Sequence, residues 1–158
     1  MTIKAGDKLP SVELKTMGAD GPTAINTDDI FNGKKVVLFA VPGAFTPTCD
    51  MAHLPGYVMK FDDFKAKGVD TVACLSVNDV FVMNAWGKSQ NAEHILMLAD
   101  GNGTFTNAIG MALDGTGFGM GQRSKRYAII VENGVVKHLG LDDKGLDKSA
   151  AEAILAAL

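Results

Sequence analysis

The chain has 158 residues, of which 47% are hydrophobic and 21% charged, and its formal net charge is −3. This length predicts one domain over residues 1–158 with its own hydrophobic core. An acidic chain with no basic run and no apolar stretch of about 18 residues argues against nucleic acid and membrane partners. No apolar leader is evident, and two cysteines, Cys49 and Cys74, are too few for a disulfide framework. We therefore expect free thiols in a reducing compartment, the cytoplasm.

Strand and helix patterns alternate from residue 35 onwards. Short apolar runs that end at turn-forming residues predict strands buried on both faces of a sheet. In chain order, the predicted elements are a strand at 35–41, a helix from 48 or 49 to 68, a strand at 69–77, a helix capped by Asn78-Asp79 that continues to 87, a strand at 94–99 and a helix at 104–109.

The last part of the chain contains the clearest local pattern. Asn133-Gly134 separates two β-rich runs, 127–132 and 135–139, which predicts a β-hairpin. A final helix is expected from about residue 147. In the earlier helix that follows the strand at 35–41, Pro55 predicts a kink. The resulting order, β-α-β-α-β-α followed by a hairpin and a helix, predicts an α/β class with a mixed β-sheet flanked by helices, an arrangement found in thioredoxin-like folds.

The segment between Pro42 and Cys49 contains the most informative chemistry. A buried strand ends, an irregular turn with two prolines follows, and Cys49 stands where a helix begins. A sulfur at a helix start faces unpaired backbone N–H groups and the positive end of the helix dipole, which favours the thiolate. The hydroxyl of Thr46, three residues earlier, can turn back towards this sulfur.

The pattern Pro42-x-x-x-Thr46-x-x-Cys49 resembles the active-site motif of the peroxiredoxins. With residues 53–56, the longer stretch resembles the type-five branch, which includes the plant type-two enzymes. Further similar blocks lie at 74–79, 86–87 and 124–127, so the resemblance covers essentially the whole chain. It implies a thioredoxin-like fold, reduction of hydroperoxides by a cysteine thiolate, and a homodimer. Thr48 departs from the family pattern, because many members have glycine there.

Thiolate formation alone explains little of a dedicated peroxidase rate. Nearly complete ionisation of an ordinary thiol at pH 7.4 gains only about 13-fold. Donors aimed at the leaving peroxide oxygen must supply the rest, at about 3–4 kcal/mol each. The expected donors are the Thr46 hydroxyl, the backbone N–H groups of Thr48 and Cys49 and, by resemblance, the guanidinium of Arg126. Pro42 is expected to shield the sulfur.

The sequence therefore predicts a thiol peroxidase that needs no metal or organic cofactor. Cys49 attacks hydrogen peroxide or an alkyl hydroperoxide and becomes a sulfenic acid, which an external thiol restores. The reductant is expected to be glutathione with glutaredoxin, with thioredoxin as the alternative. Cys74 lies in a predicted interior strand, so no resolving cysteine is expected.

Three other functions remain open from the residues alone. A thiol–disulfide oxidoreductase is disfavoured because Thr46 stands where the first cysteine of C-x-x-C would be. A cysteine hydrolase could pair Cys49 with His53, yet no orienting acid is evident, and a packing or hydrogen-bonding role is expected for this histidine. A redox sensor or holdase would need only the reactive cysteine. Arg123 and Lys125 are expected to be solvated neighbours of Arg126.

Overall fold

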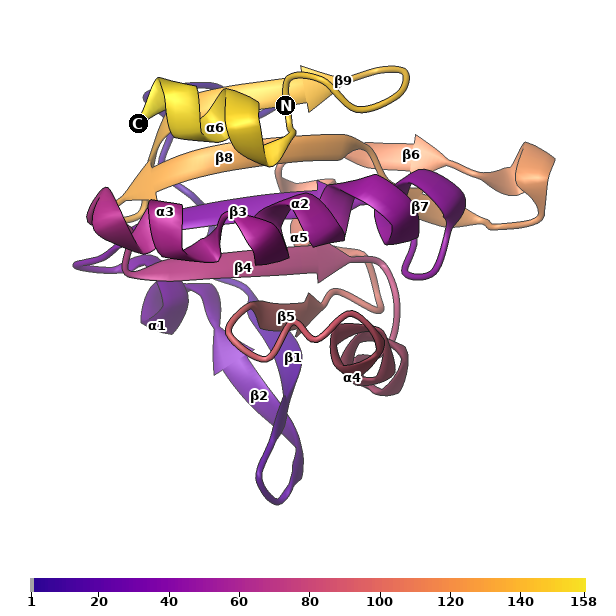
Figure 1. The fold of residues 1–158 in the computed structure, drawn as a ribbon. Coiled ribbons are helices and arrows are strands. Elements are labelled where there is room, and N and C mark those ends of the chain that lie inside the picture. Colours follow the sequence, from indigo (N-terminus) through magenta and orange to yellow (C-terminus); the bar gives the residue numbers. More distant parts are fainter. Residues whose placement is uncertain (1) are drawn as a thin grey trace.

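The computed structural model describes residues 2–158 and is built around a seven-stranded mixed sheet with helices on both faces (Figure 1). No helix in this range is both long and apolar enough to cross a membrane. The elements are β1 (Glu13–Gly18), β2 (Gly21–Asn26), α1 (Thr27–Phe31), β3 (Lys35–Val41), a π-helix (Cys49–His53), α2 (Leu54–Met59), α3 (Phe61–Ala66), β4 (Thr71–Ser76), α4 (Val80–Ser89), β5 (Leu96–Ala99), α5 (Thr104–Ala108), β6 (Ala112–Asp114), a 3₁₀ turn (Thr116–Phe118), β7 (Gln122–Ser124), β8 (Arg126–Glu132), β9 (Val135–Asp142) and α6 (Ala151–Ala157).

The sheet has the strand order β2-β1-β5-β4-β3-β8-β9. Strands β3, β4 and β5 are parallel, as the crossover helices predict, whereas β8 and β9 add to β3 as an antiparallel hairpin. Alternate residues of β3 supply two cores: Phe39 packs with α2, α4 and α6 on one face, and Leu38 packs with α1 and α5 on the other. The α/β class and the thioredoxin-like arrangement are therefore confirmed.

The hairpin turn forms as its residue types require. Asn133 and Gly134 have φ of 49° and 79°, the left-handed conformations that a two-residue turn with the correct twist needs. Strand β3 spans the predicted residues 35–41. The other predicted strands and α5 differ from the prediction by a few residues. Asp79 caps α4 as expected, since its carboxylate accepts a hydrogen bond from the N–H of Val82 (2.8 Å).

Two parts of the fold differ from the sequence prediction. The N-terminal hairpin β1–β2 and helix α1 were not predicted, because β2 is mostly exposed and has no apolar alternation. The final helix starts at Ala151 rather than near Asp147. The backbone N–H groups of Asp147, Lys148 and Ser149 instead bind the carboxylate of Asp142, which holds this segment as a loop.

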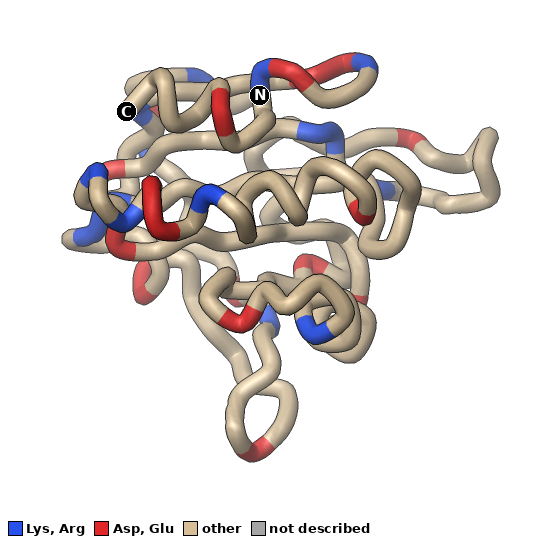
Figure 2. The backbone as a smooth tube through the Cα atoms, in the orientation of Figure 1, with Lys and Arg blue, Asp and Glu red and all other residues tan. Residues whose placement is uncertain are grey.

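Charged residues of both signs are spread over the elements (Figure 2). A basic segment stands at the beginning of β8, where the chain returns to the centre of the sheet beside β3. This strand pairing brings residues from the end of the chain to the carboxyl end of β3, where the predicted site lies.

Candidate active site

Cys49 is the first residue of the π-helical segment Cys49–His53, and its side chain is fully buried. The carbonyl of Cys49 accepts from the N–H of Leu54, five residues later, as a π-turn requires. Pro55 follows directly and has no N–H to donate to the preceding turn. The irregularity expected at Pro55 thus takes the form of a π-turn before it, and a second break at Lys60 separates α2 from α3.

The turn before Cys49 is held from two sides. Phe45 adopts a left-handed backbone conformation with φ of 65°, a strained geometry for a residue with a side chain. The N–H of Ala44 donates to Oδ1 of Asn78 at 3.0 Å, and the same oxygen accepts from Ser76 at 2.6 Å. The end of β4 therefore fixes the turn that follows β3.

The Thr46 hydroxyl is oriented differently from the expectation. It donates to the carbonyl of Gly43 at 2.7 Å, so its single proton is already used. Its remaining lone pairs can only accept a hydrogen bond. With its proton bound to the Gly43 carbonyl, the Thr46 hydroxyl is not free to donate to the leaving oxygen as expected.

Backbone donors are present where the sequence places them. Within residues 2–158, the N–H groups of Thr48 and Cys49 donate to no backbone carbonyl or side chain of the protein. They belong to the first helical turn, where N–H groups have no intrahelical partner. These two groups are free to bind a peroxide oxygen beside the sulfur.

Arg126, at the start of β8, contacts the sulfur directly. Its Nη2 donates to Sγ of Cys49 at 3.0 Å, and its Nη1 lies 2.7 Å from Nδ1 of His53. Pairing of Tyr127 with Ala40 in the β3–β8 register brings this guanidinium to the end of β3. A contact between residues 77 positions apart, inferred from resemblance, is therefore present in the structure.

His53 makes both of its ring hydrogen bonds to groups other than the sulfur. Its Nδ1 meets Arg126, and its Nε2 lies 3.0 Å from the carbonyl of Ser149. Burial, and then the charge of Arg126, lower the pKa of His53 to about 3, so the ring is neutral at physiological pH. The Cys–His hydrolase alternative is not supported, because the atom that hydrogen-bonds to the sulfur belongs to an arginine.

Pro42 directly follows β3 and shares a pocket with Arg126. The pocket has a volume of about 260 Å³ and is also lined by Leu113, Lys125, Asp142, Asp143 and Gly145. Pro42 contributes apolar surface and no N–H donor. Cys49 does not line this pocket, so shielding of the sulfur by Pro42 stays a prediction.

Residues that the motif analysis did not assign also hold the site. The carboxylate of Asp50 accepts from the indole of Trp86 (2.8 Å) and the amide of Gln90 (2.7 Å), which ties the active-site helix to α4. The block at 86–87 pointed to Trp86, but nothing in the sequence paired it with Asp50. Arg123 is half-buried, and its Nε donates to the carbonyl of Met120 at 2.9 Å, so this side chain is partly solvated.

Cys74 lies inside the sheet. It is fully buried in β4 between Phe39 of β3 and Met97 of β5. Burial raises the pKa of its thiol well above the ordinary value, which leaves it protonated and unreactive. Across residues 2–158, no group of three or more His, Cys, Asp or Glu side chains is arranged to hold a metal ion.

Comparison with known proteins agrees with this site. The Redoxin family model matches residues 4–155. The chain is 45% identical to Peroxiredoxin-2E, chloroplastic, of Arabidopsis thaliana over 163 aligned positions, which cover 99% of this chain and 70% of that protein.

Solved structures match over nearly the whole length. Reduced Prx3 of Vibrio vulnificus in complex with H₂O₂ is 55% identical, with a TM-score of 0.96 and coverage of 99% of each chain. The antioxidant protein of Plasmodium falciparum, described as a 1-Cys peroxiredoxin, is 33% identical, with a TM-score of 0.91 and coverage of 96% of each chain.

Proposed function

The chain belongs to the redoxin family and is a peroxiredoxin, a thiol-dependent peroxidase, and from this premise we propose that Cys49 is the cysteine that reacts with the peroxide. One observation carries this assignment: the Arg126 guanidinium donates to Sγ of Cys49 at 3.0 Å, while Cys74 is enclosed in the sheet. A permanent positive charge against a sulfur stabilises the thiolate, which is the nucleophilic form.

The reaction at this site is a displacement at oxygen. The Cys49 thiolate attacks one peroxide oxygen, the S–O bond forms and the O–O bond breaks. The electron pair of the O–O bond goes to the leaving oxygen, which takes up a proton and departs as water or an alcohol. Cys49 is oxidised to a sulfenic acid and the peroxide is reduced.

The surrounding groups fit this charge movement. Negative charge spreads from the sulfur to the leaving oxygen, so donors that face both atoms stabilise the transition state. We assign that role to Arg126 and to the N–H groups of Thr48 and Cys49. Thr46 accepts the hydrogen of the hydroperoxide and thereby orients it, and Pro42 limits access of water.

We further propose that a thiol from outside the chain restores Cys49. Glutathione attacks the sulfenic acid, water leaves, and a mixed disulfide forms, which glutaredoxin then reduces. Support comes from Cys74, which is fully buried in β4 and whose thiol pKa is raised by burial, so it is a poor resolving thiol. Two free, buried cysteines also fit a reducing compartment such as the cytoplasm.

Treatment with one equivalent of hydrogen peroxide, without added thiol, is expected to add one oxygen atom to the intact protein mass. Added glutathione should convert this species into a mixed disulfide. In steady state, glutathione with glutaredoxin should then support faster peroxide turnover than thioredoxin with its reductase.

Two other results would distinguish a wrong mechanism from a wrong reductant. A clean loss of two hydrogen atoms within the monomer would show a Cys49–Cys74 disulfide and would contradict the one-cysteine mechanism. Faster turnover with thioredoxin would overturn the proposed reductant but leave Cys49 as the peroxide-reactive residue.

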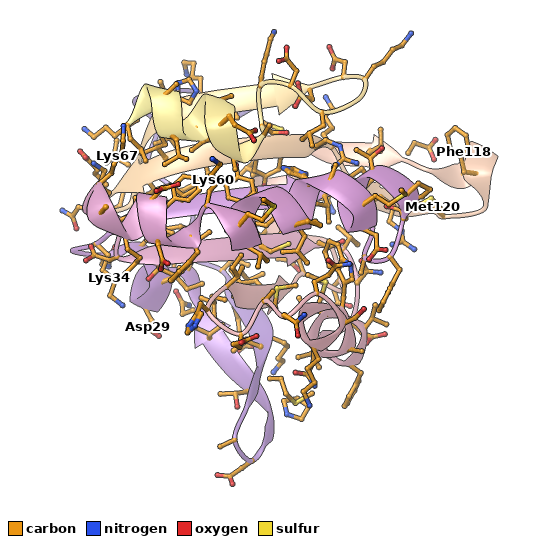
Figure 3. The ribbon with its side chains drawn as sticks, in the orientation of Figure 1. Asp29, Lys34, Lys60, Lys67, Phe118 and Met120 are labelled. Atoms are coloured by element: carbon orange, nitrogen blue, oxygen red, sulfur yellow. The ribbon has the colours of Figure 1, made fainter. Side chains whose placement is uncertain are left out.

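We also propose that two copies of this chain associate through the end of the sheet that contains the active site. Figure 1 places α4 and the β6–β7 hairpin at this end. Exposed apolar side chains gather on these elements and on the active-site turn: Phe45 is 50% exposed, Phe81 63% and Phe118 86%. Figure 3 shows Phe118 at the outer end of the hairpin, away from the sheet. Exposed aromatic residues of this size are typical of protein–protein contacts.

Phe118→Ser is expected to shift the protein from dimer towards monomer in sedimentation velocity experiments. Serine lacks the apolar ring that would contact the partner copy, and the exposed Phe118 is not part of the core. Met59→Ser is the matched control, because Met59 is 80% exposed on α2, outside the proposed interface. An unchanged dimer in the Phe118 variant would place the interface elsewhere, and a monomeric native protein would exclude it.

A further inference from the structure

His53 makes two hydrogen bonds whose directions can be assigned. Arginine has only donors, so Nη1 of Arg126 must donate and Nδ1 of His53 must accept, at 2.7 Å. The ring proton is therefore on Nε2, which donates to the carbonyl of Ser149 at 3.0 Å. The two neighbours together select one neutral tautomer and one ring orientation.

The carbonyl of Ser149 is itself held in place by the loop between β9 and α6. Asp142 accepts from the N–H groups of residues 147, 148 and 149 and from the Ser149 hydroxyl, at 2.7–3.0 Å. Gly140 permits this packing, since a Cβ there would collide with the backbone of Lys148. Tyr57 donates to the same carbonyl at 2.7 Å. The loop therefore presents a fixed acceptor to His53.

Asp142 is the β9 partner of Arg126 in the strand register and lines the same pocket, but its carboxylate accepts hydrogen bonds from the 147–149 loop. Among residues 2–158, no carboxylate lies within ion-pair distance of its guanidinium. A carboxylate in the place of His53 would orient Arg126 equally well but would cancel the charge that the sulfur and the leaving oxygen need. A neutral imidazole orients the guanidinium without this cancellation.

We propose that His53 is a positioning residue, which holds the Arg126 guanidinium so that Nη2 faces Sγ of Cys49, and that the Asp142–Ser149 loop fixes His53 for this task. The inference rests on peroxide chemistry at Cys49 and is independent of the reductant. His53 itself touches neither the sulfur nor the peroxide, and with Nδ1 occupied by Arg126 it is not a general base.

Two substitutions separate the two hydrogen bonds. His53→Leu removes both, whereas His53→Asn retains an acceptor, because Oδ1 of asparagine occupies roughly the position of Nδ1. In single-turnover stopped-flow reactions with hydrogen peroxide, we expect the leucine variant to react roughly 10- to 100-fold slower, as for a catalytic group displaced by about 1 Å. The asparagine variant should recover most of this loss.

A double-mutant cycle tests whether the effect acts through Arg126. In an Arg126→Lys background, His53→Leu is expected to have little further effect on the rate, because the group that it positions is already gone. Tyr57→Phe is the matched control: it removes the other donor to the Ser149 carbonyl, so it should lower thermal stability but leave the rate within about threefold of the native rate.

The tautomer provides a test that needs no variant. In ¹H–¹⁵N spectra of the native protein, His53 is expected to be protonated on Nε2 and unprotonated on Nδ1. A proton on Nδ1 would overturn the proposal. So would equal rates in the asparagine and leucine variants, or losses from His53→Leu and Arg126→Lys that simply multiply. An absence of fast peroxide reduction by the native protein would instead contradict the peroxide chemistry at Cys49 on which the inference rests.

Discussion

Replacing Cys49 by serine is expected to abolish catalytic peroxide reduction. The serine hydroxyl remains protonated at neutral pH and is a far weaker nucleophile than a thiolate towards a peroxide oxygen. The donors around the site would still bind a peroxide, but they would have no nucleophile to assist. Stopped-flow measurement of hydrogen peroxide loss with excess protein is expected to give no fast phase for Cys49→Ser.

The matched control is the second cysteine. Cys74→Ala is preferred to Cys74→Ser, because a hydroxyl in the middle of β4 would be buried without a partner. The alanine variant is expected to lose about 1–2 kcal/mol of stability through the small cavity, while its rate with peroxide stays near the native value. Fast peroxide reduction that survives in Cys49→Ser and disappears in Cys74→Ala would reverse the assignment of the two cysteines.

The parts of the fold that the sequence predicted well are those that depend on neighbouring residues. The run Lys35–Val41 is apolar throughout because both faces of β3 are covered, and its bounds in the structure are those predicted. The Asn133-Gly134 turn is equally local, since these two residues accept positive φ at low cost. Local patterns of this kind need no knowledge of the tertiary structure.

The elements that the sequence did not predict are held by distant partners. The segment around Asp147 has helix-compatible residues, but Asp142 captures its N–H groups and delays the helix until Ala151. The π-turn at Cys49 arises where Pro55 removes a donor and α4 anchors Asp50 through Trp86. Tertiary hydrogen bonds override helix propensity in both places.

The active-site residues also fall into two groups, those predicted from local sequence and those brought in by distant parts of the chain. The motif placed Thr46 and Cys49 together because they are three positions apart in one turn. Arg126 was assigned through resemblance alone, since no local pattern could bring together residues 77 positions apart. The partners of His53, at separations of 73 and 96 residues, could not be predicted, because they depend on the register of β8 and on the course of the loop before α6.

Arg126→Lys is expected to slow the reaction with hydrogen peroxide by roughly 30- to 900-fold, equivalent to about 2–4 kcal/mol of transition-state stabilisation. Lysine retains the positive charge but presents it as a compact ammonium group at the end of a flexible stem. In the native protein, one guanidinium plane contacts both His53 and Cys49, at 2.7 and 3.0 Å. An ammonium group cannot reproduce this fixed fork. The positive charge is therefore no longer held beside the leaving oxygen, where negative charge develops.

The measurement must separate transition-state stabilisation from thiolate formation. The pH profile of Cys49 alkylation by iodoacetamide gives the thiolate fraction of each variant, and the peroxide rate is divided by that fraction. Arg123→Lys is the matched control, because Arg123 lies on the neighbouring strand β7 and its Nε is bound to the Met120 carbonyl rather than to the sulfur. An equal loss in the two variants would assign the effect to a general disturbance of this segment rather than to the Arg126 fork, because both substitutions retain the positive charge. A native corrected rate in Arg126→Lys would show that the guanidinium fork contributes nothing to the transition state. A loss confined to Arg126→Lys is the expected result, because only this side chain donates to the atom that attacks the peroxide.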